Sequence, residues 1–172
     1  IYVSDSNNNR VMKWAPGASS GTLVAGGNGQ GSSNNQLNQP SSVFLDSSEN
    51  IFISEYGNNR VTKWAPGATE GVIVAGGMNN ITKVVVDDLG NIYVSDTGNN
   101  QIMKFTSGET SGEVFVGGNG AGSDLNQFSG QVGFNFDSKG NIYVADLFNN
   151  RIQKVQIAPE LTIAAGETTG TV

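Results

Sequence analysis

The chain has 172 residues, of which 37% are hydrophobic and 14% charged, and its formal net charge is −6. It contains no Cys and no His, which excludes disulfides, thiolate chemistry, and the commonest metal ligand and general base. The acidic balance disfavours nucleic acid and anionic lipid, and no apolar run approaches the roughly 18 residues of a membrane helix. We therefore expect neither a nucleic acid nor a membrane as partner. The cellular location stays open, with an extracellular one slightly favoured.

Short runs rich in Val, Ile and aromatic residues follow one another along the chain, separated by clusters of Asn, Gly, Asp and Ser. They predict strands near residues 1–5, 10–14 and 23–27, then near 43–46, 51–55, 60–64 and 73–77. Two further sets are expected near 84–87, 92–96, 101–105 and 114–118, and near 134–137, 142–146, 151–155 and 163–166. The first set lacks the strand that begins the other three. One segment, 1–172, thus divides into a partial unit at 1–27 and units at 43–77, 83–118 and 132–166.

The clearest repeat is a pentapeptide that ends in an acidic residue. It reads Ile-Tyr-Val-Ser-Asp at 1–5 and 92–96, Ile-Phe-Ile-Ser-Glu at 51–55, and Ile-Tyr-Val-Ala-Asp at 142–146. Four-stranded units that recur every 40 to 50 residues or so are typical of propeller blades, because one such sheet cannot bury both of its faces alone. The sequence therefore predicts an all-β fold, a β-propeller of four-stranded antiparallel blades.

The runs at 90–100 and 140–151 resemble the NHL repeat, and the segment 37–43 is similar to that family's Leu-x-x-Pro-x-Gly-Val lead-in to the inner strand. This resemblance implies a propeller, usually of six blades around a central channel. It also implies, in most members, a platform that binds proteins or other ligands. Some members bind RNA, and one branch is a lyase that holds its metal partly through His, which this chain lacks.

The chain departs from the family pattern at three places. Gln101 stands where Arg is expected, and the lead-in of the third blade has shortened to residues 78–82. In the fourth blade, Phe128 stands where the second blade has Pro40.

The chain is too short for a closed ring of six blades, which predicts an open arc. Six blades of about 45 residues need roughly 270 residues, whereas this chain holds three blades and the last three strands of another. Because open strand edges recruit other chains, we expect either a piece of a longer protein, which is favoured, or an arc completed by another copy through its open blade edges.

An acidic residue ends the second strand of every unit, and Arg or Gln begins the next strand across an Asn-Asn turn. The acids are Asp5, Glu55, Asp96 and Asp146, and the residues that face them are Arg10, Arg60, Gln101 and Arg151. A ring of four acids could hold a hard cation. Hydrogen bonds that fix each hairpin are the favoured interpretation, since a scaffold element recurs in every blade. We predict no metal and no cofactor.

The turn after each acid differs between units. The two residues before Asn-Asn include Asn7, Tyr56, Thr97, Leu147 and Phe148. Apolar side chains on a rigid turn are candidate contacts for a partner, with packing onto the adjacent blade as the equally weighted alternative.

The sequence therefore favours a non-catalytic scaffold that binds a protein or peptide through the loops at one end of the propeller. A calcium-dependent hydrolase of the lactonase type is the enzyme alternative, since carboxylate and Asn oxygens can bind calcium. A structural array that assembles edge to edge is the third hypothesis. The two tryptophans, Trp14 and Trp64, are each followed by Ala-Pro-Gly and are expected to pack between outer strands.

Overall fold

The computed structural model describes residues 1–156, which form four antiparallel sheets and no α-helix. The first sheet contains β1 (Tyr2–Asp5), β2 (Arg10–Lys13) and β3 (Thr22–Gly26). The second contains β4 (Pro40–Leu45), β5 (Ile51–Glu55), β6 (Arg60–Trp64) and β7 (Val72–Ala75). The third contains β8 (Ile81–Val86), β9 (Ile92–Asp96), β10 (Gln101–Phe105) and β11 (Glu113–Gly117). The fourth contains β12 (Gln131–Phe136), β13 (Ile142–Asp146) and β14 (Arg151–Val155).

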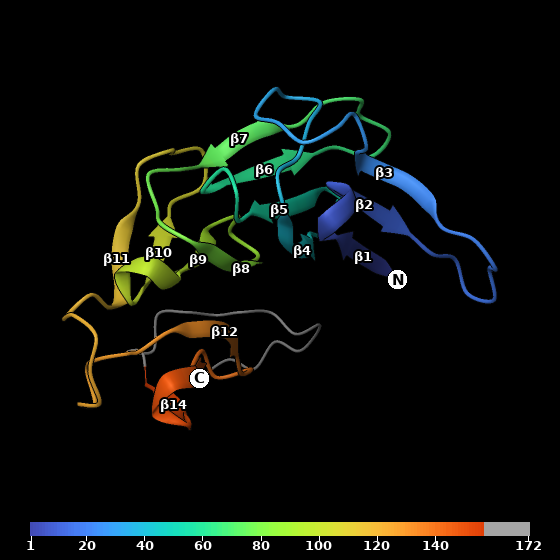
Figure 1. The fold of residues 1–172 in the computed structure, drawn as a ribbon. Helices are drawn as coiled ribbons and strands as arrows, with labels where there is room; N and C mark the ends of the chain where they lie inside the picture. The colour runs from blue at the N-terminus through green and yellow to red at the C-terminus, as the bar shows by residue number, and fades with distance from the viewer. Residues whose placement is uncertain (157–172) are drawn as a thin grey trace.

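The sheets follow one another as blades of an arc (Figure 1). Within each blade the strands lie in chain order, and the first strand lies toward the inside of the arc. Neighbouring blades touch through these inner strands, because β4 contacts both β1 and β8, and β8 contacts β12. The predicted β-propeller architecture is confirmed. The strand expected near 163–166 lies outside the described residues, and closure into six blades stays a prediction.

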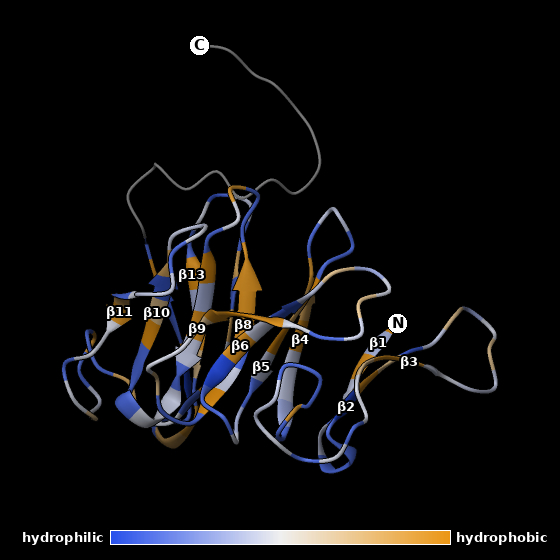
Figure 2. Cartoon of the chain, turned by 90° about the horizontal axis from the view of Figure 1, so that it is seen from above, coloured by the Kyte–Doolittle hydropathy of each residue, from blue (hydrophilic) through white to orange (hydrophobic). Residues whose placement is uncertain are grey.

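Each junction between blades contains its own hydrophobic core. In the two middle blades, all five residues of β5 and of β9 are buried, as expected for strands covered on both faces. Three clusters fill the three junctions, and Phe44 packs against two of them. Figure 2 shows hydrophobic residues in the strands, most clearly in β8, and hydrophilic residues in the connecting loops. Burial between blades, rather than within one sheet, therefore holds the arc together.

The last described blade differs in burial on one face. Ile152 is 67% exposed, whereas Val61 and Ile102 at the equivalent positions of the second and third blades are fully buried. Those two side chains are covered by the following blade. Within residues 1–156, no further blade lies against β14.

Trp64 is the last residue of β6 and Trp14 directly follows β2, and in both blades the glycine just before the next strand makes room for the indole ring. Trp64 is 2% exposed, and a Cβ placed on Gly71 would lie 2.5 Å from its indole nitrogen. Gly21 has the same relation to Trp14, at 2.8 Å. The packing role expected for Trp64 is confirmed.

The strand register corrects one sequence alignment. Pro40 pairs with Glu55 and Gln131 pairs with Asp146, so Gln131, not Phe128, is the equivalent of Pro40. Phe128 instead corresponds to Leu37, since both form a parallel bridge to the start of their linker and both are buried. The sequence alignment was wrong because it matched an aromatic residue to the position of the proline without knowledge of this bridge.

Candidate functional site

The end of each blade that carries the Asn-Asn turns is built around its acidic residue. In the second blade, Glu55 is fully buried. Its carboxylate accepts hydrogen bonds from Arg60 Nε at 2.9 Å, Asn58 Nδ2 at 2.6 Å and Thr62 Oγ1 at 3.1 Å. The backbone N–H of Asn38 donates a fourth, at 3.2 Å. The buried charge therefore has partners on both of its oxygens, which offsets its loss of hydration.

The Arg of this pair also holds the linker that enters the blade. Arg60 Nη1 donates to the carbonyl oxygen of Ser32 at 2.6 Å. Its Nη2 lies 3.4 Å from the carbonyl oxygen of Ser33 and 3.3 Å from that of Gln36. One planar guanidinium thus joins the turn of the blade to the linker at residues 27–39.

The fourth blade repeats this arrangement. Arg151 donates through Nε to Asp146 at 2.7 Å, and through Nη1 to the carbonyl oxygen of Ser123 at 2.6 Å. Its Nη2 donates to the carbonyl oxygens of Asp124 and Gln127 at 3.0 and 3.1 Å. The linker at residues 118–130 is therefore held by the same geometry.

The third blade has Gln101 in place of the Arg, and its short linker accounts for this difference. The linker before it comprises only residues 76–80 and presents no loop of carbonyl groups to a guanidinium. Gln101 stands at the position of the Arg and donates through Nε2 to Asp96 at 2.7 Å. The long side chain of Arg is not needed here, because there is no linker loop for it to reach. The choice between Arg and Gln at this position follows the length of the linker.

The second Asn of the first three turns connects one blade to the next. Asn9, Asn59, Asn100 and Asn150 all have a left-handed backbone, with φ between 51° and 53°. The side-chain oxygens of Asn9 and Asn59 accept the backbone N–H groups of Gln39 and Asn80, at 2.9 and 2.6 Å. Asn suits both tasks, because it tolerates positive φ and offers an acceptor.

Hydrogen bonds lower the pKa of the acid in the fourth blade. Burial by itself would raise the pKa of Asp146, but Asn149 Nδ2 at 2.9 Å, the N–H of Ser129 at 2.6 Å and Arg151 Nε outweigh it. The net effect holds this pKa below its usual value.

We expect the protein to lose stability as the pH falls below about 4. Because the folded pKa of Asp146 is depressed, its contribution is complete above the unfolded value, near 3.9, and is lost as the pH falls through the folded value. Urea denaturation midpoints between pH 2 and pH 6 measure this. The Asp146→Asn variant should show a shallower decline than the native chain, and an equally steep one would contradict the assignment.

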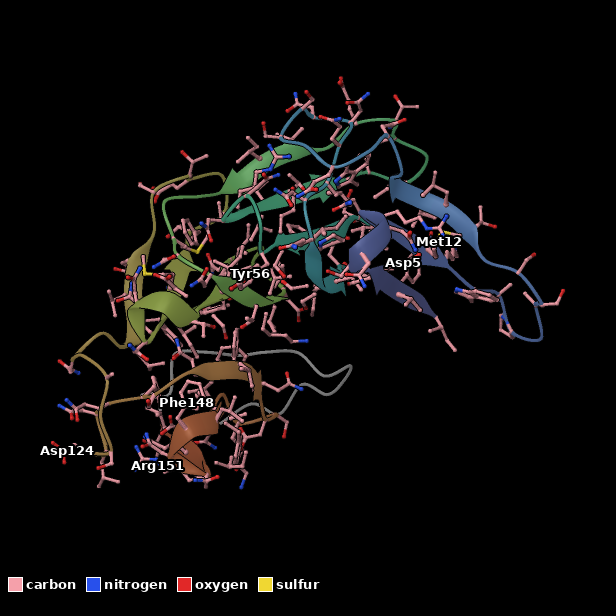
Figure 3. All side chains as sticks on the ribbon, in the orientation of Figure 1. Asp5, Met12, Tyr56, Asp124, Phe148 and Arg151 are labelled. Carbon is pink, nitrogen blue, oxygen red and sulfur yellow. The ribbon has the colours of Figure 1, made fainter. Side chains whose placement is uncertain are left out.

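The differing turn residues lie at this same end of their blades. We call Asn7, Tyr56, Thr97, Leu147 and Phe148 the turn face. Tyr56, Leu147 and Phe148 are 41%, 51% and 72% exposed, and Asn7 is exposed on the 3₁₀ turn η1 (Ser6–Asn8). Figure 3 shows Tyr56 beside the inner strands and Phe148 beside the fourth blade.

The backbone of the turn face is tied to the linkers. The N–H of Tyr56 donates to the carbonyl oxygen of Gln39, and that of Phe148 to Ser129, each at 3.1 Å. The ring of Phe148 lies over Gly130, where an added Cβ would be 2.5 Å from it. The main chain is therefore fixed while the side chains stay largely exposed.

Thr97, on the 3₁₀ turn η2 (Thr97–Asn99), differs from the other turn-face residues. Its hydroxyl lies 2.9 Å from that of Thr82 and donates to the carbonyl oxygen of Gln131 at 2.7 Å. It thus joins the third blade to the inner strand of the fourth, and this position contributes to packing between blades.

Leu125 is an exposed apolar residue that the sequence did not single out. Leu125 is 85% exposed in the linker at residues 118–130, where the first long linker has the polar Asn34. The difference between two otherwise similar linkers could have identified it.

The acids do not form a common ligand set. Within residues 1–156, no group of three or more acidic side chains is placed to hold a metal ion. No helix of this part of the chain is long and apolar enough to cross a membrane.

The family comparison identifies the central unit. Residues 78–105, which include the short lead-in, β8, β9 and β10, match the family model of the NHL repeat. This one segment of the chain is matched by the NHL repeat. A search of the curated proteins found no match to the chain.

Solved structures similar to this chain share its fold. A Bacteroides thetaiotaomicron protein of unknown function has a TM-score of 0.70 and 17% identity, covering 89% of this chain and 43% of its own. An auxiliary nutrient binding protein from the same organism has a TM-score of 0.67 and 16% identity, covering 89% and 44%. A chain of a nidogen/laminin complex has a TM-score of 0.61 and 16% identity, covering 89% and 59%. The chain spans about half the length of these proteins.

Proposed function

We propose that the chain is part of a non-catalytic propeller that binds a protein or peptide through the turn face. The observation that supports this most directly is the exposure of Tyr56, Leu147 and Phe148 on turns whose backbone is hydrogen-bonded to the linkers. Exposed aromatic and aliphatic groups on a rigid frame lose little conformational entropy on binding.

The repeat pattern supports the same proposal. The acid, the Asn pair and the left-handed turn recur in every blade because each forms contacts that the scaffold needs. The two residues between them differ from blade to blade: Thr97 joins two blades through its hydroxyl, whereas Tyr56, Leu147 and Phe148 expose their side chains. A binding surface made of several different turns on one frame can recognise one partner specifically.

The comparisons add a coarser argument. An NHL repeat is present, and one structure of similar fold was determined in a protein complex, that of nidogen and laminin. The calcium-dependent alternative is less favoured, because the acids of the turns already accept hydrogen bonds from their own blades. Light scattering of the chain would test the array alternative, which requires assemblies larger than a dimer.

A selected peptide tests the proposal. A phage-displayed peptide library is panned against the chain, and the enriched peptide is measured by calorimetry. The double variant Leu147→Ser and Phe148→Ser is expected to weaken binding at least tenfold, because each truncation removes a candidate hot-spot contact.

The matched control lies on the outer strand of the third blade, away from the turn face. Val114, in β11, is 51% exposed, so Val114→Ser removes an exposed apolar group elsewhere. It should leave the affinity unchanged. Peptides that lose binding with Val114→Ser and keep it with the turn-face variant would refute the turn face as the recognition surface.

A further inference from the structure

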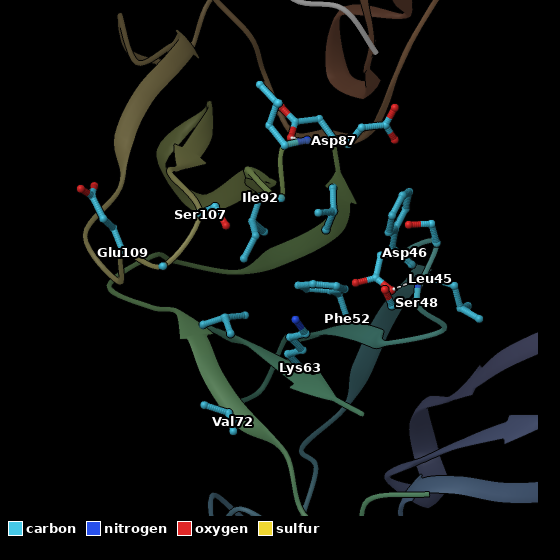
Figure 4. Close-up of a pocket in the computed structure, with 18 of the residues that line it drawn as sticks. Leu45, Asp46, Ser48, Phe52, Lys63, Val72, Asp87, Ile92, Ser107 and Glu109 are labelled. Atoms are coloured by element: carbon cyan, nitrogen blue, oxygen red, sulfur yellow. Dashed lines mark hydrogen bonds between the residues drawn. The ribbon is translucent and has the colours of Figure 1, made fainter. Parts of the chain in front are cut away.

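A groove of about 610 Å³ lies between the second and third blades, at the end opposite the turn face (Figure 4). Its floor contains Phe44, Phe52, Val86 and Ile92. One wall is the outer strand β7, and the other is the loop at residues 107–110 of the next blade. Its volume falls within the range of about 300–1,000 Å³ of small-ligand pockets.

The groove exists because two side chains are small at this junction. Between the third and fourth blades, Phe115 and Phe136 pack edge-on against Tyr93, with ring centroids 4.9 and 5.0 Å from it. Val74 and Val86 occupy the equivalent positions of β7 and β8, around Phe52. The same scaffold is thus filled at one junction and hollow at the next.

The groove carries an excess of negative charge. Its lining includes Asp46, Asp87, Asp88 and Glu109, against the single cation Lys63. Burial by itself would raise the pKa of Asp46. Hydrogen bonds from the side chain and N–H of Asn50 outweigh burial and keep this pKa below its usual value, so the carboxylate is ionised at neutral pH.

The apolar floor of this groove already accommodates a cation. Lys63 Nζ lies 5.3 Å from the centroid of the Phe52 ring, within the range of a cation–π contact. Aromatic floor and acidic lining together favour a ligand with an apolar body and a positively charged end.

The wall of the groove offers a place for an extended backbone. Strand β7 pairs with β6 alone, so its other side has no strand partner in residues 1–156. Val72 and Ile73 on this edge are 67% and 44% exposed. Edge strands of this kind bind extended peptides by adding a strand.

From these contacts we propose that the groove between the second and third blades is a second binding site, which takes an arginine or lysine side chain of an extended peptide lying along β7. The aliphatic stem packs on the floor and the charged end meets the acidic lining. The site is independent of the turn face, and either can fail without the other.

Two peptides and one charge variant test the site. Acetyl-Leu-Arg-Leu-amide and the peptide with citrulline in place of arginine are titrated into the full chain by calorimetry at 50 and 500 mM NaCl. Citrulline preserves shape and removes the charge. At 50 mM NaCl the arginine peptide should bind at least tenfold more tightly than the citrulline peptide. At 500 mM NaCl the binding of the arginine peptide should be several-fold weaker. Glu109→Gln should weaken it by about threefold or more, since one carboxylate is lost at an exposed position.

The filled junction supplies the steric control. Val74→Phe with Val86→Phe reproduces the side chains found between the third and fourth blades and should abolish binding. Circular dichroism and thermal unfolding establish that this variant folds, and Glu109→Gln tests the site if it does not. The turn-face variant, Leu147→Ser with Phe148→Ser, should bind the peptide unchanged. Equal affinity for the two peptides, no saturable binding up to millimolar concentration, or an unaltered Glu109→Gln variant would overturn the proposal.

Discussion

Replacing Arg60 by alanine is expected to lower the free energy of unfolding by about 3–5 kcal/mol, because it leaves the fully buried Glu55 carboxylate without its cationic partner. The same change removes the donors to the carbonyl groups of Ser32, Ser33 and Gln36. The linker at residues 27–39 should therefore loosen together with the blade. Chemical denaturation followed by circular dichroism measures the loss, which is a large part of the 5–15 kcal/mol typical of a domain.

The first blade provides the matched control for this substitution. Arg10 and Asp5 form the same contact at 2.8 Å, but their side chains are 40% and 28% exposed. Solvent screens this pair, so Arg10→Ala should shift the denaturation midpoint far less than Arg60→Ala. Similar shifts for the two variants would show that burial does not govern the strength of the pair.

Gly26→Ala is expected to destabilise the protein by about 2–5 kcal/mol, the sum of a left-handed backbone and an overpacked contact. Gly26 ends β3 with φ of 71°. A Cβ there would lie 2.5 Å from the carbonyl oxygen of Asn9 and 2.9 Å from the side chain of Leu37. The carbonyl belongs to the backbone and cannot turn aside. Urea denaturation of the two proteins gives the difference directly.

Gly76 is the control for the glycine prediction. It follows β7 as the short linker begins, its φ lies outside the left-handed region, and no atom lies within 4 Å of an added Cβ. Gly76→Ala should be neutral or stabilise by up to about 1 kcal/mol, because it reduces the freedom of the unfolded chain. A large loss at this position would contradict the explanation by steric contact.

Together, these positions relate the length of each linker to the residues that hold it. The long linkers at 27–39 and 118–130 come with Arg60 or Arg151 in the blade they enter, and with Gly26 or Gly117 where they begin. The short linker at 76–80 has Gln101 in the blade it enters, and its first residue, Gly76, lies outside the left-handed region, although Gly77 has φ of 77°. At these positions the residue type differs between blades together with the length of the linker.

The amino-acid sequence by itself determined the β-propeller, since four strand units with one repeated pentapeptide must stack on one another to bury their apolar faces. It also brought the acids and the turn residues to one end of the blades, because antiparallel strands of fixed length return to the same edge. Three features became clear only from the tertiary structure. Gln101 takes the place of Arg where the linker is short, Thr97 joins two blades, and a groove opens beside Val74 and Val86. Each depends on which residues of separate blades meet across a junction, and strand periodicity carries no information about that pairing.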